Sequence, residues 1–229
     1  MLQEKNVYVD KGLKAYFSNI YQYLGLNLLL AGATSFFVLS EPRVFRMFFG
    51  TPLFYVLMFA PLGIVMYLGR SIERISFSKA QGFFWAYGII QGALMSGFLS
   101  MYTFESVVRC FMISAAVFLS AAVYGRYTSK DLSSMRSILN IGIFGVIIAS
   151  LVNIFMGSSL VQHMISWAVI GIFTALVASD MQQLLAIYFT RQSKDNFEKI
   201  AVMGALSLFI SFINIFISIL QLFGDRKDR

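Results

Sequence analysis

Seven long apolar runs constrain the fold of this chain more than any other feature. Most span roughly 18–25 residues, and an α-helix rises about 1.5 Å per residue, so each run is long enough to cross a hydrocarbon core of about 30 Å. The runs are continuous rather than alternating, which excludes membrane-spanning strands. We therefore predict seven transmembrane helices, over Ile20–Leu39, Pro52–Leu68, Ala80–Tyr102, Ser106–Tyr124, Ile138–Phe155, Val161–Tyr188 and Ala201–Phe223.

The composition supports the same class of protein. The chain is 58% hydrophobic and 13% charged, whereas soluble domains average roughly 45–50% apolar and about 25% charged residues. We predict an all-α membrane protein, a seven-transmembrane-helix bundle surrounded by the lipid bilayer. The expected organisation is a polar N-terminal tail over residues 1–19, one membrane domain over 20–224 and a short basic tail over 225–229. No cleavable signal peptide is visible, so the first span is expected to remain as an uncleaved anchor.

The Lys and Arg residues predict the orientation. The net charge is +7, but the basic residues are scattered through short loops, which is typical of a topology signal rather than of nucleic-acid binding. With the N-terminus inside, twelve of the 18 Lys and Arg residues fall on the cytoplasmic side and six on the other. We therefore predict a cytoplasmic N-terminus. Seven spans put the basic tail outside, whereas a last segment that dips in and returns would put it inside, and the sequence leaves both open.

The sequence offers little for catalysis or metal binding. Cys110 and His163 are the only residues of their kinds, which excludes an internal disulfide and a Cys or His metal cluster. No nucleophile with a plausible base is present. We therefore expect a protein that is not an enzyme and has no tightly bound cofactor.

One carboxylate interrupts the sixth predicted span. Asp180 lies in the stretch "GIFTALVASDMQQLLAI", followed by Gln182 and Gln183. An ionised Asp at a helix centre costs about 2.5–3.5 kcal/mol on insertion scales, so such a residue normally faces a bundle interior or a wet cavity, or is protonated. Two readings stay open. Either "SDMQQ" marks an early cytoplasmic end of the helix and Asp180 is solvated, or Asp180 is buried and functional.

Counting along the last two spans predicts a counterpart for Asp180. If they form an antiparallel hairpin about a midpoint at Asp195, the residue at the same depth on the last span is Ile210 or Ser211. A Ser211 hydroxyl there could donate a hydrogen bond to Asp180, and Asn214, on the same helix face, could do so as well. Gln183 and Asn153 are further polar side chains that could support such a site, whereas ordinary interhelical hydrogen bonding is the favoured alternative for Asn153 and Asn214.

Two charged residues at helix boundaries have simpler explanations. Asp131 stands just before the fifth predicted span, where an acid is favoured by the positive end of the helix dipole. Arg109 opens the fourth predicted span, and its side chain is expected to extend to the outer interface as an anchor.

Several phrases together resemble one known family. They are "AAVYGRYTSKDLSSM", "IIASLVNIFMGSS", "ASDMQQ" and "GALSLFISFINIFISILQLFG". In order and spacing they resemble the Bax inhibitor one-like family, the small seven-helix proteins with the transmembrane BAX inhibitor motif. The chain is most similar to the bacterial inner-membrane branch. The resemblance covers about residues 21–224 and implies a multi-pass protein of the bacterial inner (plasma) membrane with a central C-terminal helix.

The resemblance also implies a function. The family members that conduct ions resemble pH-sensitive calcium leak channels, in which the C-terminal helix plugs the pore. Two aspartates in the last two spans form the proton-sensitive latch. Asp180 matches the first of these positions, whereas Ser211, in "FISFIN", replaces the second acid. Without a second carboxylate, neither a strongly coupled titration nor strong calcium binding is expected. We therefore predict a weaker proton switch and only weak calcium binding at Asp180.

A second role is implied by other bacterial relatives. Some act by binding a membrane-anchored ATP-dependent protease and restraining its digestion of membrane proteins. That role requires an exposed N-terminal tail and a well-packed bundle but no permeation path. The loss of the second acid shifts weight from the calcium leak towards this alternative.

Overall fold

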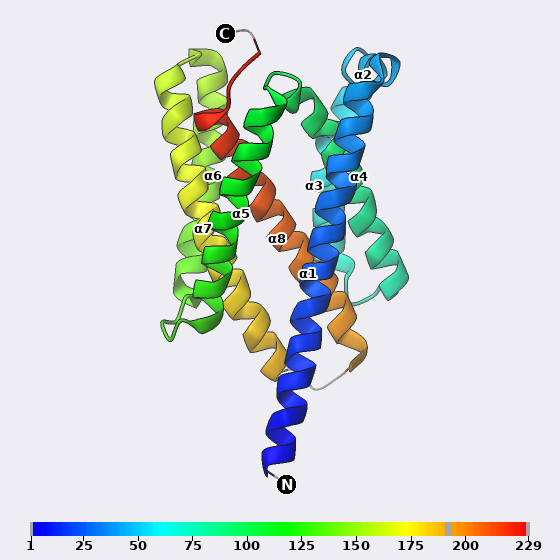
Figure 1. The fold of residues 1–229 in the computed structure, drawn as a ribbon, viewed down its shortest axis with the longest axis vertical. Helices are drawn as coiled ribbons and strands as arrows, with labels where there is room; N and C mark the ends of the chain where they lie inside the picture. The colour runs from blue at the N-terminus through cyan, green and yellow to red at the C-terminus, as the bar shows by residue number, and fades with distance from the viewer. Residues whose placement is uncertain (1, 191–193, 228–229) are drawn as a thin grey trace. The chain divides into compact units, whose positions relative to one another are not determined.

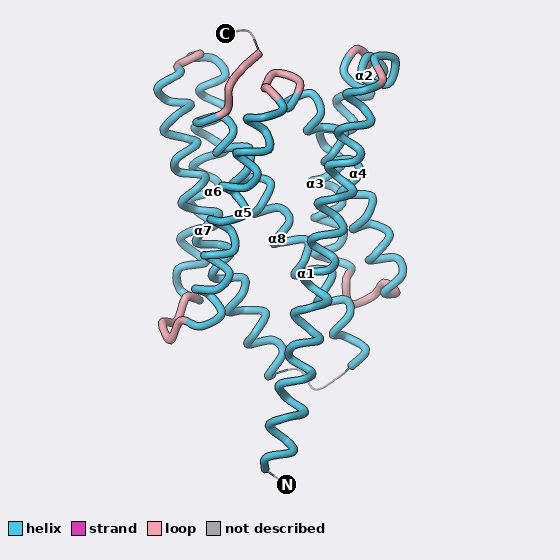
Figure 2. Tube along the Cα trace, viewed as in Figure 1, coloured by secondary structure: helices cyan, strands magenta, loops and turns pink. Residues whose placement is uncertain are grey.

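The computed structural model describes residues 2–190 and 194–227, with side chains described over 11–190 and 197–227. Over these residues the chain is helical almost throughout (Figures 1 and 2). Seven of the helices found there are long and apolar enough to cross a membrane. The helices are α1 (Leu2–Ser40), α2 (Pro42–Phe49), α3 (Leu53–Ser71), α4 (Phe77–Leu99), α5 (Phe104–Tyr127), α6 (Ser133–Met156), α7 (Ser159–Thr190) and α8 (Lys194–Phe223).

The predicted all-α membrane fold and its seven spans are confirmed, with differences at the ends. The helix α1 begins at Leu2, so most of the predicted polar tail is helical. Likewise, α8 begins at Lys194 rather than Ala201. Polar residues such as Gln, Glu and Lys are good helix formers, so a helix does not have to end where the bilayer ends. The last two residues of the predicted basic tail lie outside the described residues.

The short helix α2 was not predicted. It begins at Pro42, a residue whose fixed φ angle and missing N–H suit the first turn of a helix. It ends before Gly50, whose backbone N–H donates to the Arg46 carbonyl at 2.8 Å. Its eight residues are too few to span a bilayer, and none of them is buried.

The chain packs as two compact units. The first comprises Met1–Met101 and Gln192–Phe209, and the second comprises Tyr102–Arg191 and Ile210–Arg229. The helix α8 therefore contributes its first half to one unit and its second half to the other. It is also the most buried span: 67% of its most apolar stretch is buried, against at most 39% in any other span. The central position of the C-terminal helix stays a prediction.

In the first unit, small residues allow α1 and α4 to approach closely. A Cβ added at Gly92 would overlap the backbone of Ala31, and one added at Gly88 would overlap the side chain of Asn27. The buried Asn27 donates from Nδ2 to the Phe84 carbonyl at 3.2 Å. Contacts between backbones and small side chains of this kind are a usual basis of helix association in lipid.

The second unit holds the candidate site. Its helices α5 and α7 also approach at a glycine, because a Cβ added at Gly125 would overlap the backbone of Ala178. Phe212 of α8 makes edge-to-face ring contacts with Phe111 and Phe118 of α5. The helix α6 has a single fully buried residue, Asn153, and many of its apolar side chains are exposed.

Candidate functional site

Asp180 is buried inside α7. The helix continues for ten residues beyond it, to Thr190, and Asp180 is only 4% exposed. The residues before it, from Leu176 to Ser179, are also buried. The reading of "SDMQQ" as an early, solvated helix end is therefore wrong, and Asp180 is buried, whereas its functional role stays a prediction.

The Asp180 carboxylate forms an ion pair with Arg136. The Arg136 Nη1 atom lies 2.5 Å from Asp180 Oδ1. Arg136 belongs to the first turn of α6, where the positive end of the helix dipole also favours an anion. The Asp180 side chain is 5% exposed and that of Arg136 is 35% exposed. A buried carboxylate thus meets a guanidinium that retains access to solvent, which offsets the cost of burying the charge.

The register of the α6–α7 hairpin brings this pair together. The turn lies at Gly157 and Ser158, where Gly157 adopts a left-handed φ of 62° and its N–H donates to the Asn153 carbonyl. Arg136 lies 22 residues before Ser158, and Asp180 lies 22 residues after it. Two antiparallel helices of equal rise place such residues at the same level. Counting from this turn identifies Arg136, one of the twelve Lys and Arg residues that the predicted orientation places on the cytoplasmic side.

Gln182 fixes the connector between α5 and α6 next to the ion pair. Its Oε1 accepts from the Leu132 backbone N–H, and its Nε2 donates to the Lys130 carbonyl, each at 2.8 Å. Gln183, which was predicted as a supporting residue, is exposed. The amide that organises this end of the unit is therefore Gln182 and not Gln183.

The expected hydrogen bonds from α8 to Asp180 are not formed. Ser211 is 3% exposed, yet among the described residues no hydrogen bond joins it to Asp180. Asn214 Nδ2 donates instead to the Ile210 carbonyl of its own helix, at 2.8 Å. Asn214 is thus paired within α8, as polar side chains in spans often are.

The assumed register explains this error. A midpoint at Asp195 would place Val169 level with Gln221. In the structure, Gln162 and Ser166 hydrogen-bond to Gln221 at 3.1 and 2.8 Å, which is one to two turns away from Val169. The register assumed from Asp195 therefore does not hold where α7 meets Gln221, and it gives no ground for placing Ser211 level with Asp180.

Asn153 belongs to a second polar network, far from Asp180. Its Nδ2 donates to Gln162 Oε1 at 3.3 Å, and Gln162 Nε2 donates to Gln221 Oε1 at 3.1 Å. This network links α6, α7 and α8. Seventeen residues separate Arg136 from Asn153, about 25 Å along the helix, so Asn153 does not support the Asp180 site as predicted.

Asp131 lies just before α6, as predicted for an acid at a helix N-terminus, and it also accepts a hydrogen bond there. Its Oδ1 accepts from the Ser133 backbone N–H at 2.9 Å, at the start of α6. The hydrogen bonds from the backbone and side chain of Ser133 lower the pKa of the Asp131 carboxyl below its ordinary value.

No metal centre accompanies the ion pair: within residues 11–190 and 197–227, no three His, Cys, Asp or Glu side chains lie close enough to hold a metal ion. Calcium takes 6–8 oxygen ligands, and at Asp180 it would compete with Arg136 for the carboxylate. Weak calcium binding there stays a prediction.

Comparison with known proteins identifies the family. A family model described as "Inhibitor of apoptosis-promoting Bax1" matches residues 13–228. A Rickettsia prowazekii protein is 36% identical over 224 residues, covering 98% of this chain and 95% of its own. A Caulobacter vibrioides protein is 32% identical over 230 residues, covering 96% and 92%. The Escherichia coli inner membrane protein YbhL is 28% identical over 219 residues, covering 94% of each chain. The chain therefore belongs to the Bax inhibitor one-like family of multi-pass, all-α membrane proteins.

Proposed function

We propose that this protein is a pH-modulated calcium (cation) leak of the bacterial inner membrane, with Asp180 as its proton-sensitive group. The buried ion pair between Asp180 and Arg136 carries the proposal. A titratable carboxylate inside a membrane span is costly and is, by default, a candidate for function. The inner-membrane location is supported by the relative YbhL, which is described as an inner membrane protein.

The ion pair supplies a physical basis for a response to protons. Protonation of Asp180 would remove its negative charge and with it the attraction for Arg136. The Arg136 side chain, 35% exposed, could then turn towards water. The start of α6 would lose one of its attachments to α7. Gln182 would still hold the connector, so the expected change is local.

Ser211 limits the strength of this response. A second carboxylate near Asp180 would share a proton with it and produce a coupled titration. With Ser211 in that family position, no second carboxylate is supplied there, and Asp180 pairs with the Arg136 guanidinium instead. We therefore propose a shallow pH dependence and weak divalent binding, with calcium as permeant ion rather than as cofactor. The proposed role involves neither catalysis nor nucleic acid.

Calcium flux into dye-loaded liposomes tests this function. The wild type should admit calcium with a shallow pH dependence, and Asp180→Asn should remove that dependence. Ser211→Asp should make it steeper. If the wild type and Asp180→Asn both admit no calcium above empty liposomes, the channel proposal is wrong.

The orientation is part of the proposal. We propose a cytoplasmic N-terminus, because that choice places twelve of the 18 Lys and Arg residues on the cytoplasmic side, as the positive-inside rule requires. A reporter fused to the N-terminus that fluoresces only in the cytoplasm should be bright. A dark, stable fusion would reverse the assignment.

A second candidate function is restraint of a membrane-anchored ATP-dependent protease. It is favoured by α1, whose helix begins at Leu2, within the polar residues that precede the span predicted from Ile20. Such a polar helical extension offers a contact for a partner. Co-purification of the protease with the full chain, lost on deletion of residues 2–10, together with absent calcium flux, would favour this candidate over the leak.

A further inference from the structure

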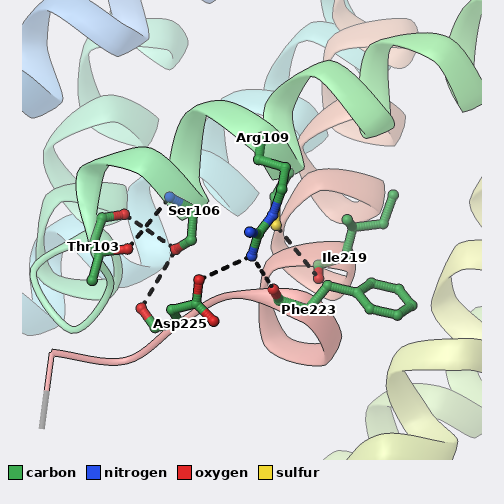
Figure 3. Close-up of polar contacts among 7 residues, drawn as sticks. Thr103, Ser106, Arg109, Ile219, Phe223 and Asp225 are labelled. Carbon is green, nitrogen blue, oxygen red and sulfur yellow. Dashed lines mark hydrogen bonds and ion pairs between the residues drawn. The ribbon is translucent and has the colours of Figure 1, made fainter. Parts of the chain in front are cut away.

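The residues that follow α8 turn back onto the start of α5. We name Gly224–Arg226 the C-terminal clasp. Figure 3 shows Asp225 of the clasp between Thr103 and Ser106 on one side and Arg109 on the other. Thr103 is the N-cap of α5, and Phe223 is the last residue of α8. The clasp therefore joins the end of one helix to the beginning of another.

Thr103 and Ser106, at the start of α5, hydrogen-bond to the backbone of the clasp. The Asp225 carbonyl accepts from the Thr103 N–H at 2.9 Å and from the Ser106 hydroxyl at 3.4 Å. Tyr102 and Arg226 form an isolated antiparallel bridge. In addition, the Arg226 guanidinium lies 5.9 Å from the centroid of the Tyr102 ring, within the range of a cation–π contact.

Arg109 makes further hydrogen bonds to the end of α8 and to the clasp. Its Nη2 donates to the Phe223 carbonyl at 3.1 Å and to Asp225 Oδ2 at 3.0 Å. One guanidinium thus satisfies a carbonyl at the negative end of α8 and pairs with a carboxylate. Arg109 thus has defined partners on α8 and the clasp, and its role as an interfacial anchor stays a prediction. The two side chains are 55% and 66% exposed, so the pair is accessible to salt and is weak on its own.

Steric fit restricts the clasp at Gly224. A Cβ added there would come within 2.7 Å of Tyr102 Cδ1 and of Leu220 Cδ1. Tyr102 is 2% exposed and has no room to move aside without disturbing the loop before α5. Glycine is therefore required for the closed form of the clasp.

A native reporter lies directly beneath the clasp. Cys110, the residue after Arg109, is the only cysteine of the chain. Its side chain is 0% exposed, and its Sγ lies 4.0 Å from the Ile219 carbonyl, between α5 and α8. A thiol reagent can reach this sulfur only when the seam between these two helices opens, because reaction at a buried site follows local opening.

We propose that the C-terminal clasp is a releasable lock on the α5–α8 seam, with Arg109 as the positioning residue that keeps the end of α8 in place. When the clasp is closed, Cys110 is shielded from solvent. When Asp225 is released, the seam opens and the thiol is exposed. The proposal concerns the seam itself and does not depend on whether ions pass through the protein.

Maleimide labelling of Cys110 tests the lock, using the full chain in nanodiscs. Asp225→Ala should raise the labelling rate about fivefold, the scale of one exposed charge-assisted interaction. Gly224→Ala should raise it as well. Raising the salt concentration should accelerate labelling of the wild type but not of Asp225→Ala. Lys227→Ala, which alters the tail charge beyond the clasp, is the matched control and should label at the wild-type rate. Cys110→Ser supplies the blank.

A charge exchange separates the lock from general destabilisation. Arg109→Glu and Asp225→Arg each place like charges together and should accelerate labelling. The double variant restores opposite charges and should label more slowly than either single variant. Equal labelling of the wild type, Asp225→Ala and Gly224→Ala, in samples with unchanged thermal midpoints, overturns the proposal. A double variant that labels faster than both single variants overturns it as well.

Discussion

Arg136, in the first turn of α6, lies 2.5 Å from the buried carboxylate of Asp180 on α7. Each residue reduces the free-energy cost of placing the other at this site. The carboxylate has left water and requires a counter-charge, whereas the guanidinium keeps part of its surface in solvent and so loses less hydration. The pair also ties the start of α6 to α7, which makes it a structural contact as well as a candidate proton-sensitive site.

Removal of the guanidinium should destabilise the protein more than removal of the whole pair. Breaking a fully buried pair costs about 3–5 kcal/mol, and the partial exposure of Arg136 reduces this to about 1–3 kcal/mol for Arg136→Gln. The double variant Arg136→Gln with Asp180→Asn should recover part of the loss, because no buried charge remains. Thermal unfolding in detergent, followed by tryptophan fluorescence, measures both. Additive losses in the double variant would show that the two side chains do not interact.

The two adjacent glutamines should differ sharply. Gln182→Ala removes two hydrogen bonds to the connector and should cost about 1–2 kcal/mol of stability. Gln183→Ala alters an exposed position and should change stability by less than about 0.5 kcal/mol. Hydrogen exchange of the Leu132 amide should also accelerate in the first variant only. Equal behaviour of the two variants would contradict the assigned hydrogen bonds.

The spans could be predicted from the sequence, and the partner of Asp180 could not. The length and position of a continuous apolar run indicate those of the helix, so the span predicted for α4 lies within a few residues of Phe77–Leu99. Pairing between helices depends on register, which no single run contains. Counting about Asp195 led to Ser211, whereas counting about Ser158 leads to Arg136. The turn at Ser158 is the better point from which to count, because a shorter turn fixes the midpoint of a helical hairpin more closely.

The burial of Asp180 also could not be predicted from the sequence pattern. The local composition "SDMQQ" resembles a helix end, yet α7 continues through it to Thr190, and Gln182 bonds to the α5–α6 connector. The choice between Gln182 and Gln183 needed the helix face, since the two residues differ by about 100° around α7. The short helix α2 was missed because its eight residues give no membrane signal.

Asp131 should contribute to stability in a pH-dependent manner. Hydrogen bonding to Ser133 lowers the pKa of its carboxyl in the folded state. Its contribution is therefore present above the unfolded carboxyl pKa of about 3.9 and is lost as the pH falls through the lower folded value. Asp131→Ala should unfold at a lower midpoint than the wild type at pH 7, and the difference should disappear in strong acid. A difference that grows on acidification would have the wrong sign for this hydrogen bond.

The approach of α5 to α7 provides the sharpest steric test. A Cβ at Gly125 would overlap the backbone of Ala178, two residues before Asp180, whereas a Cβ at Gly145 of α6 would meet nothing within 4 Å. Gly125→Ala should separate the two helices and cost about 1–3 kcal/mol. Gly145→Ala should be neutral or stabilising by up to about 1 kcal/mol, because alanine is the better helix former. The thermal midpoints of the two alanine variants, compared in the same detergent, decide the matter. Similar midpoints would mean that α5 and α7 do not meet at Gly125.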